Sequence, residues 1–389
     1  MRDKPYCNAP WLGLAYESTQ GCKPCCEWKH DTFRGTYEEY IKSDYLKDFK
    51  EIMYRDKTDP GCIECIHNEK VGGHSRRKYY EKWDNDVDYE APGLNRIMRL
   101  DYRAGNKCNM KCRMCGPQSS SMREEEMIVF EGRRKDFIKH LDTSDVYDLD
   151  LTHCEEISIL GGEPSIDLKV RKFMNHVADN YPNIEIIVTT NATNASDKWF
   201  KTLMRFCTGP GLRVILSVDA TGETQDFQRS GGEWNKIKKN IEKYKEISDS
   251  SEYNCSVSIQ LTASALNMTT LDRWWDELLN IGIRIEINQV WWPEGMSIEA
   301  IPDEYKKQSI KFLENRLDRY GQKYNESYAA KQAIRILKGI EYSEHVQREF
   351  VALQNKYDKY RNENVRDLDD RFKVMMDSNP TPSTSYLTK

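Results

Sequence analysis

The chain has 389 residues, more than one ordinary domain, with 38% hydrophobic and 31% charged residues. Its net charge of -5 argues against a sequence-independent nucleic-acid binder. A mean hydropathy of -0.80 and the lack of a long apolar run argue against an integral membrane protein. The chain begins MRDKPYC, without the apolar segment of a secretory signal, so we expect a cytoplasmic protein.

Residues 1 to about 90 contain no sustained helical or strand period and are rich in aromatic and charged side chains. Four prolines interrupt them: Pro5, Pro10, Pro24 and Pro60. Half of the twelve cysteines of the chain also lie in this segment. In a reducing compartment, clustered thiols are more often metal ligands or catalysts than disulfides. We therefore expect residues 1–90 to form a small Cys-rich module that a metal stabilises.

Residues 91–300 have a different pattern, in which short strand-like runs alternate with helix-compatible stretches, as in a parallel α/β sheet. Six strands are predicted, over Arg96–Tyr102, Glu156–Leu160, Ile184–Thr190, Arg213–Asp219, Asn254–Thr262 and Arg284–Val290. The predicted helices between them include Leu168–Asn180, Asp197–Cys207, Trp234–Ile247 and Thr270–Ile281.

Several of these strands alternate apolar and polar residues, whereas strands covered on both faces read as continuous apolar runs. In the fifth strand Val257 and Ile259 alternate with Ser258 and Gln260. This pattern favours a curved sheet or partial barrel with helices outside and a ligand-filled cavity inside. A single half-exposed edge strand would give the same alternation.

Residues 301–389 are strongly charged and have helical periods around Tyr305–Tyr320, Ala329–Ile340 and Val346–Tyr360. They predict a helical C-terminal extension packed on the core. The chain ends in a proline- and serine-containing stretch from Pro380, which we interpret as a flexible tail.

The most specific motif is Cys108-x3-Cys112-x2-Cys115, which directly follows the first predicted strand. A four-iron cluster held by three cysteines leaves one iron free for an external ligand. A structural zinc site requires a fourth ligand close by in the sequence, but the next cysteine is Cys154.

This triad resembles the hallmark of the radical S-adenosylmethionine (radical SAM) superfamily, whose fold is a partial (β/α)6 barrel. The sequence Leu160-Gly-Gly-Glu-Pro164 is similar to the family motif that receives the amino group of the methionine moiety. The resemblance implies that Gly161 and Gly162 allow close backbone approach and that Glu163 supplies charge for the ammonium.

Further cofactor contacts are implied at the carboxyl ends of later strands, where α/β sheets bind ligands. Ser217, Asp219 and Arg229 are candidates for ribose or carboxylate contacts, and Asn191 for the same pocket. The remaining candidates are Gln260, in the polar phase of the fifth strand, and Met114, at a position that is often aromatic in the family.

A second metal site is predicted from the N-terminal cysteines, because Cys62 and Cys65 form a C-x2-C pair typical of zinc ribbons and Fe–S clusters. With Cys7 and one of Cys22, Cys25 or Cys26 they would complete four ligands, and we favour Cys26. The segment resembles the twitch or SPASM-like auxiliary-cluster module, found in proteins several of which are phage-encoded. The resemblance implies a second Fe–S cluster, with structural zinc as the alternative.

The same resemblance implies an activity. A [4Fe-4S] cluster would cleave S-adenosylmethionine to a 5′-deoxyadenosyl radical that abstracts hydrogen from a substrate. A peptide or protein side chain is the preferred substrate, and a flavodoxin or ferredoxin the expected type of electron donor. The alternatives are a small metabolite or nucleoside as the substrate, or a non-catalytic Fe–S or zinc protein.

Other residues receive simpler interpretations. Cys154 and Cys255 are expected to be core thiols, and Cys207 has no evident partner. The pair Trp291-Trp292 follows the sixth strand and could form a substrate wall. The run 75–78 with His67 and His74 is interpreted as solvated surface, without a role.

Overall fold

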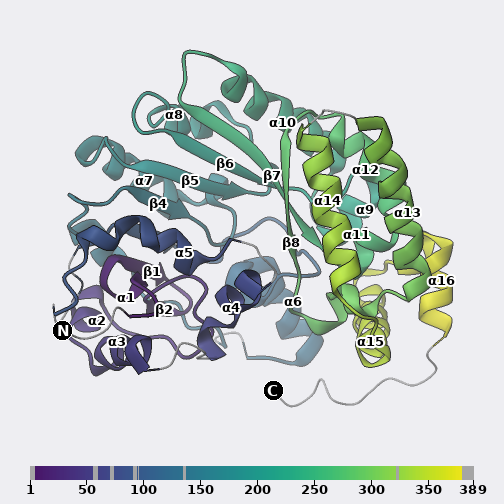
Figure 1. The fold of residues 1–389 in the computed structure, drawn as a ribbon, viewed down its shortest axis with the longest axis horizontal. Coiled ribbons are helices and arrows are strands. Elements are labelled where there is room, and N and C mark those ends of the chain that lie inside the picture. Colours follow the sequence, from purple (N-terminus) through teal and green to yellow (C-terminus); the bar gives the residue numbers. More distant parts are fainter. Residues whose placement is uncertain are drawn as a thin grey trace.

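The computed structural model describes residues 5–55, 60–70, 74–90, 94, 96–134, 137–320 and 324–378 (Figure 1). The predicted tail from Pro380 lies outside these residues. In the described part of the chain, no helix combines the length and apolarity needed to cross a bilayer.

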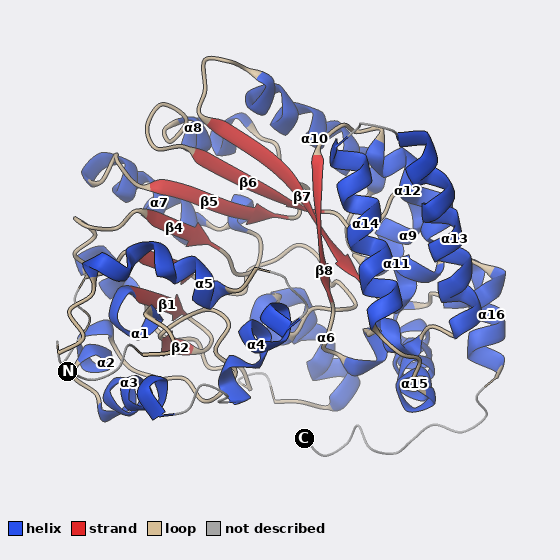
Figure 2. Ribbon diagram, viewed as in Figure 1, coloured by secondary structure: helices blue, strands red, loops and turns tan. Residues whose placement is uncertain are grey.

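One open sheet of eight strands organises the chain, in the order β2-β1-β3-β4-β5-β6-β7-β8 (Figure 2). The strands are β1 (Gly13–Glu17), β2 (Gly21–Lys23), β3 (Arg99–Arg103), β4 (Glu156–Ile159), β5 (Glu185–Thr190), β6 (Leu212–Ser217), β7 (Cys255–Ala263) and β8 (Arg284–Gln289). All neighbouring strands pair in parallel except β1 and β2. Strands β3 to β8 confirm the six predicted strands within a few residues at each end.

Helices connect these strands, as a parallel sheet requires. They are α6 (Ser121–Glu131), α7 (Leu168–Asn180), α8 (Asp197–Met204), α9 (Gly222–Gln228), α10 (Trp234–Asp249), α11 (Ala265–Thr269) and α12 (Leu271–Leu279). The predicted bounds of α7 are confirmed. This helix begins at Asp167, whose side chain accepts a hydrogen bond from Lys169 N, and it buries Val170, Phe173 and Val177 on one face.

One face of the sheet is apolar and the other polar, as the alternation of apolar and polar residues in the sequence predicted. In β6, Leu212, Val214 and Leu216 are buried in the main core, while Arg213 and Ser217 on the other face are partly exposed. The sheet is therefore an α/β partial barrel whose apolar face meets the helices and whose polar face lines the interior.

Ion pairs occupy the polar face at the amino ends of the central strands. Arg99 of β3 pairs with the buried Glu156 of β4, and Arg213 of β6 pairs with Glu185 of β5 at 2.8 Å. Lys82, from the N-terminal part of the chain, reaches Glu156 at 2.5 Å. Charged side chains therefore fill the interior at the amino ends of these strands.

The N-terminal part of the chain joins the sheet, which the sequence analysis did not anticipate. β1 pairs with β3, and its side chains Leu14 and Tyr16 are buried in the main core. All five β1 residues are buried, so their sequence carries no polar alternation. The helices of this part are α1 (Ala9–Leu12), α2 (Tyr37–Ile41), α3 (Asp44–Arg55), α4 (Ile63–Lys70) and α5 (Arg76–Tyr80).

Four helices form the predicted C-terminal extension: α13 (Asp303–Tyr320), α14 (Tyr324–Gly339), α15 (Glu344–Arg361) and α16 (Asp370–Asp377). α14 covers the edge strand β8, where Gln332 Oε1 accepts a hydrogen bond of 3.3 Å from Ile287 N (Figure 1). α15 contacts α6 through Lys356, which pairs with Glu131 at 2.9 Å.

The packing of β1 predicts that the N-terminal part is not thermodynamically separate from the sheet. Leu14→Ala should lower the free energy of unfolding by ~2–5 kcal/mol, because Leu14 is fully buried in the main core. Urea unfolding followed by circular dichroism would measure this. Val129→Ala, at a side chain that is 70% exposed, is the control and should change stability little. An equally small effect of Leu14→Ala would contradict the role of β1.

Candidate active site

A cavity of about 150 Å³ opens at the carboxyl ends of the central strands, next to the loop that follows β3. Its lining includes the cysteine triad, the Gly-Gly-Glu turn and polar side chains from β5 and β6: Cys108, Cys112, Cys115, Gly161, Gly162, Glu163, Asn191, Ser217 and Arg229. The fold therefore brings together most of the residues singled out in the core.

The three thiols of this cavity could hold an iron–sulfur cluster. Burial raises the pKa of Cys108 to about 12, so a metal must displace its proton to bind the thiolate. The hydrogen bond from Cys112 lowers the pKa of Cys115, because it favours the thiolate of Cys115. Among the described residues no other cysteine lines this cavity. Three thiolates and one open coordination position fit a four-iron cluster that takes an external ligand.

The cysteine loop is packed directly against the Gly-Gly-Glu turn. A Cβ at Gly162 would lie 2.1 Å from Lys107 O, and Gly161 has a φ of 121° that favours glycine. Glu163 N donates to Lys107 O at 2.7 Å, and Gly162 N to Gly105 O at 3.2 Å. The two glycines are therefore needed for the turn to touch the loop.

The carboxylate of Glu163 is buried and has protein partners, although the sequence analysis expected it to meet a ligand ammonium. It accepts hydrogen bonds from Ser165 N at 3.0 Å, Thr190 Oγ1 at 2.6 Å and Asn191 N at 2.6 Å. Burial raises the pKa of Glu163. Three of about four acceptor positions are thus used within the protein. This side chain ties the end of β4 to the end of β5.

Asp219 and Arg229 form a buried, bidentate ion pair behind the cavity. The Asp219 oxygens accept from Arg229 Nε at 2.6 Å and Nη2 at 3.0 Å, and also from Thr262 N at 2.8 Å. Arg229 lines the cavity, whereas the lining does not include Asp219. Asp219 is placed to orient Arg229 and to join β6 to the end of β7.

Two other candidates lie outside the cavity lining. Gln260 Nε2 donates to Glu286 O at 3.0 Å, which links β7 to β8. Met114 is partly buried and packs against the main core. The lining also includes a residue that the sequence analysis missed, Arg103 of β3, whose Nε lies 3.6 Å from the buried Glu17 of β1. Arg103 lies on the polar face of β3, with Arg99 and Asp101, and directly precedes the cysteine loop, so the sequence pattern could have identified it as a site residue.

A second set of thiols lines a small apolar cavity in the N-terminal part. Its lining includes Cys7, Cys25, Cys62 and Cys65, beside Phe49 and Met53. Cys7 Sγ accepts a hydrogen bond of 3.4 Å from Ala9 N, and burial raises the pKa of Cys7 to about 12.

The structure brings Cys25 to this cavity, instead of the favoured Cys26. Cys26 Sγ lies 3.8 Å from Glu27 Oε1 and contacts Asp101 of β3, while Cys22 is buried in the main core. Neighbouring residues in an extended turn project to different sides, and their order in the sequence does not say which one faces the other thiols.

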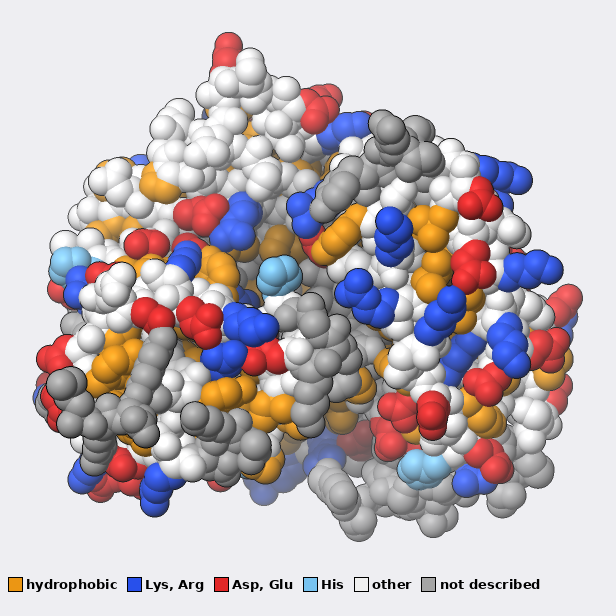
Figure 3. Space-filling model, viewed as in Figure 1, with side chains coloured by type: hydrophobic (Ala, Val, Ile, Leu, Met, Phe, Trp, Pro, Cys, Tyr) orange, Lys and Arg blue, Asp and Glu red, His pale blue; other side chains and the backbone are white. Residues whose placement is uncertain are grey.

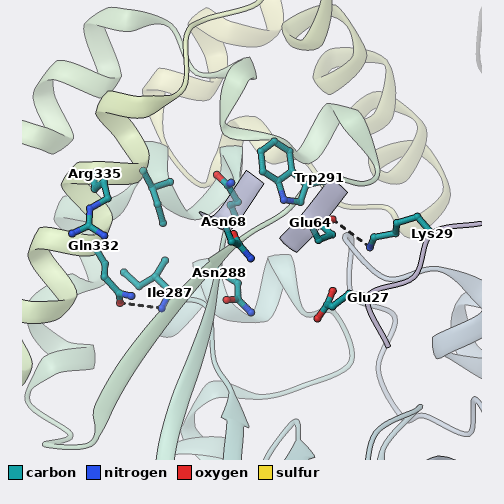
Figure 4. Close-up of a pocket in the computed structure, with 11 residues that line it drawn as sticks. Glu27, Lys29, Glu64, Asn68, Ile287, Asn288, Trp291, Gln332 and Arg335 are labelled. Carbon is teal, nitrogen blue, oxygen red and sulfur yellow. Dashed lines mark hydrogen bonds and ion pairs between the residues drawn. The ribbon is translucent and has the colours of Figure 1, made fainter. Parts of the chain in front are cut away.

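A larger cavity, of about 400 Å³, lies between the N-terminal part, β8 and α14 (Figure 4). It is lined by Glu27, Lys29, Glu64, Asn68, Ile287, Asn288, Gln289, Trp291, Gln332, Arg335 and Ile336. Lys29 and Glu64 form an ion pair of 3.3 Å, and Trp291 is 40% exposed at the wall. Figure 3 shows charged side chains of both signs around the hollow on this face of the molecule.

This cavity lies close to both thiol sites. Glu27 lines it and also lines the N-terminal thiol cavity. Ser217 of β6, which lines the triad cavity, is paired in register with Gln260 of β7, and Gln260 is paired with Glu286 of β8. Glu286 lies two residues before Asn288, which lines the larger cavity. Two strand spacings separate β6 from β8, about 10 Å. A molecule in the larger cavity could therefore extend along the sheet to the triad cavity.

The N-terminal arginines and the single cysteines also have partners. Arg77 pairs with Glu69 at 2.6 Å, and Arg76 lines the thiol cavity, so this run is not simply solvated surface. No partner of Cys207 was evident in the sequence, and in the structure its thiol hydrogen-bonds with that of Cys255. The side chain of His67 lies outside the described residues.

The contacts of Glu163 predict a structural penalty that is separate from ligand binding. Glu163→Ala should lower the free energy of unfolding by ~1–3 kcal/mol or more, because it leaves the buried Asn191 N–H without its acceptor. Glu163→Gln retains one carbonyl acceptor and should cost less. Thermal unfolding without any ligand would measure both variants. Equal stability of Glu163→Ala and the unsubstituted protein would contradict this assignment.

Comparison with known families gives one match. Residues 102–259 match the family model described as the Radical SAM superfamily. The matched residues run from the end of β3 into β7 and include the triad, the Gly-Gly-Glu turn and the β6 end. A search of curated protein sequences found no match.

The solved structures that match part of the chain have low sequence identity to it and low TM-scores. anSMEcpe, solved with bound AdoMet and Cp18Cys peptide, is 18% identical, with 63% of this chain and 62% of that chain covered and a TM-score of 0.37. Streptococcus suis SuiB bound to precursor peptide SuiA is 14% identical, with 63% and 50% covered and a TM-score of 0.39. TYW1 with a lysine-pyruvate adduct bound is 14% identical, with 56% and 73% covered and a TM-score of 0.34. The chain thus spans less than two thirds of the length of the first two.

Proposed function

We propose that this chain, an enzyme with a radical SAM domain in residues 102–259, uses bound S-adenosylmethionine to abstract hydrogen from a peptide or protein side chain. The observation that carries the proposal is the cavity that three thiols share with the Gly-Gly-Glu turn. Cys108, Cys112 and Cys115 would hold a [4Fe-4S] cluster. Bound there and reduced, such a cluster would supply the one electron needed to break the carbon–sulfur bond of S-adenosylmethionine into methionine and a 5′-deoxyadenosyl radical.

The residues of the chain bind and orient the nucleotide. The guanidinium groups of Arg229 and Arg103 offer charged donors for its carboxylate, and Ser217 offers a hydroxyl for the ribose. Because Asp219 holds Arg229 by two hydrogen bonds, this donor is oriented before the ligand arrives. Met110, which is buried and lines the same cavity, helps to exclude water.

The second thiol cavity is proposed to hold an auxiliary metal centre. Four thiols supply a complete set of ligands, Cys7, Cys25, Cys62 and Cys65, so no open position would remain for a substrate. An iron–sulfur cluster there would serve as an electron acceptor or donor during turnover. Structural zinc is the second candidate, because four thiolates suit either metal.

A peptide is the preferred substrate because of the larger cavity beside β8. Its lining includes four amide side chains, those of Asn68, Asn288, Gln289 and Gln332, which can both donate to and accept from peptide groups. Trp291 offers an apolar surface for a side chain. The exposed Trp291 also favours a second candidate, a nucleoside stacked on its ring. The external electron donor is proposed to be a flavodoxin or ferredoxin.

The first test of this proposal concerns the triad. Protein reconstituted anaerobically with iron and sulfide, and then reduced, should convert S-adenosylmethionine to 5′-deoxyadenosine, measured by chromatography. The triple variant Cys108→Ala, Cys112→Ala, Cys115→Ala should lose this cleavage because no ligand for the catalytic cluster remains. Cys255→Ala, a cysteine in neither thiol cavity, is the control. Undiminished cleavage by the triple variant would exclude the triad as the cluster site.

The second test compares two adjacent cysteines. Cys25→Ala should lose the second metal centre, because Cys25 lines the N-terminal thiol cavity, whereas Cys26→Ala should keep it. Iron, sulfide and zinc contents of both variants would be measured. The electron paramagnetic resonance signal of the triad cluster should remain in both.

The metal that Cys25→Ala loses decides between the two candidates for this centre. A decrease in iron content equal to that of one cluster supports an auxiliary Fe–S cluster, and loss of zinc alone supports structural zinc. Loss of metal in Cys26→Ala but not in Cys25→Ala would overturn the ligand set.

A further inference from the structure

The cysteine loop extends a side chain into the C-terminal extension. Arg113, between the second and third cysteines, is fully buried. Its Nη1 donates to Gln354 Oε1 of α15 at 2.7 Å, and its guanidinium forms ion pairs with Asp358 and Glu363. The same group lies 3.7 Å from the centre of the Phe227 ring. A residue of the triad motif is thus anchored on a helix far away in the sequence.

Side chains around α15 contact the loop in return, at three alternate carbonyl groups. Tyr357 Oη donates to Arg113 O at 3.1 Å, and Arg361 Nη2 donates to Lys111 O at 2.7 Å. Arg123 of α6 donates from Nε to Cys115 O at 3.1 Å and from Nη2 to Tyr357 Oη at 2.8 Å. The carbonyl groups of Lys111, Arg113 and Cys115 are therefore all hydrogen-bonded to one connected group of side chains.

The opposite edge of the loop is held by the last residue of α9 and by the segment that follows it. Lys111 N donates to Ser230 O at 2.8 Å, and Arg113 N donates to Gln228 O at 2.9 Å. Arg361 joins the two sides, since its Nη1 also donates to Ser230 Oγ at 2.9 Å. The loop is therefore enclosed between residues 228–230, next to the cavity residue Arg229, and α15.

Basic side chains outnumber carboxylates in this contact. The guanidinium groups of Arg113, Arg123 and Arg361 and the ammonium group of Lys111 meet the carboxylates of Glu126, Asp358 and Glu363. Arg361 is almost fully buried, and its Nε lies 2.6 Å from Glu126 Oε1. Removing the guanidinium of Arg361 would take one positive charge away from the surroundings of the loop, and less positive surroundings disfavour adding an electron to a cluster.

We propose that α15 clamps the catalytic cysteine loop, with Tyr357 and Arg361 as positioning residues that fix its backbone and raise the reduction potential of the cluster. This inference rests on the proposed function in one respect, that the triad holds the cluster. The C-terminal extension then belongs to the cluster site, although none of its residues is a metal ligand.

The test uses the full chain with and without its cluster. In protein without the cluster, hydrogen exchange of the amides of residues 108–116 should be about tenfold faster in Arg361→Met, the effect of losing about one net hydrogen bond. Tyr357→Phe, which removes only a hydroxyl group, should also accelerate the hydrogen exchange of these amides. Arg366→Met, whose partner Asp377 lies on the surface, is the matched control and should leave them unchanged.

In the reconstituted protein, Arg361→Met should make the midpoint potential of the triad cluster more negative than in Arg366→Met. Arg361→Lys keeps the positive charge but cannot bind Glu126 and Lys111 O at the same time as a guanidinium does. It should therefore restore the midpoint potential of the cluster but not the slow hydrogen exchange of the loop amides. If Arg361→Met does not fold, Tyr357→Phe carries the exchange test.

The outcomes separate this inference from the proposed function. Normal cluster assembly and nucleotide cleavage with unchanged exchange in both Arg361→Met and Tyr357→Phe would overturn the clamp and leave the function standing. Faster exchange in protein that binds no cluster at the triad would support the backbone clamp while the proposed function fails. An unchanged potential in Arg361→Met with faster exchange would overturn the electrostatic part of the proposal.

Discussion

The contact between the cysteine loop and the Gly-Gly-Glu turn sets the geometry of the whole site. Lys107 O lies so close to Gly162 that no Cβ fits between them, and the backbone of Glu163 bonds to the same carbonyl. The turn in turn determines where β5 ends relative to β4, because the Glu163 carboxylate binds Thr190 and Asn191. Two glycines and one buried carboxylate thereby fix the thiols relative to three successive strands. The thiols gain a defined position from backbone contacts, without rigidity of their own side chains.

The two thiol cavities differ in chemistry and in origin, because the triad comes from one short loop whereas the N-terminal cysteines come from distant parts of residues 7–65. The triad cavity has three thiols and is lined by polar side chains from strand ends, which suits a site that must admit a charged ligand. The N-terminal cavity is lined by four thiols, by apolar side chains and by the charged residues Glu27, Arg76 and Arg77, and four thiols are a full ligand set for a closed centre. The larger cavity beside β8 shares Glu27 with the N-terminal cavity, so the two cavities are adjacent at that residue.

Much of the core could be predicted from the sequence, because its signals are local. The alternation in β6 and β7 and the spacing of the triad depend on neighbours a few residues apart. β1 was missed because all its residues are buried, so it shows no period, and its partner β3 lies far along the chain. The choice between Cys25 and Cys26 depends on side-chain direction in a turn, which residue order does not encode. The contacts of Arg113 with α15 join distant segments, and no periodic pattern reports such a pairing.

The pairing of β1 with β3 also constrains the order of assembly during synthesis. Gly13 cannot find its partner Arg99 until the intervening residues have been made, and contacts between distant segments form slowly because a long loop must close first. Until then the four thiols of the N-terminal cavity belong to a segment that lacks its place in the sheet. A nascent chain of this protein therefore carries unprotected thiols that can be oxidised before β3 has been made.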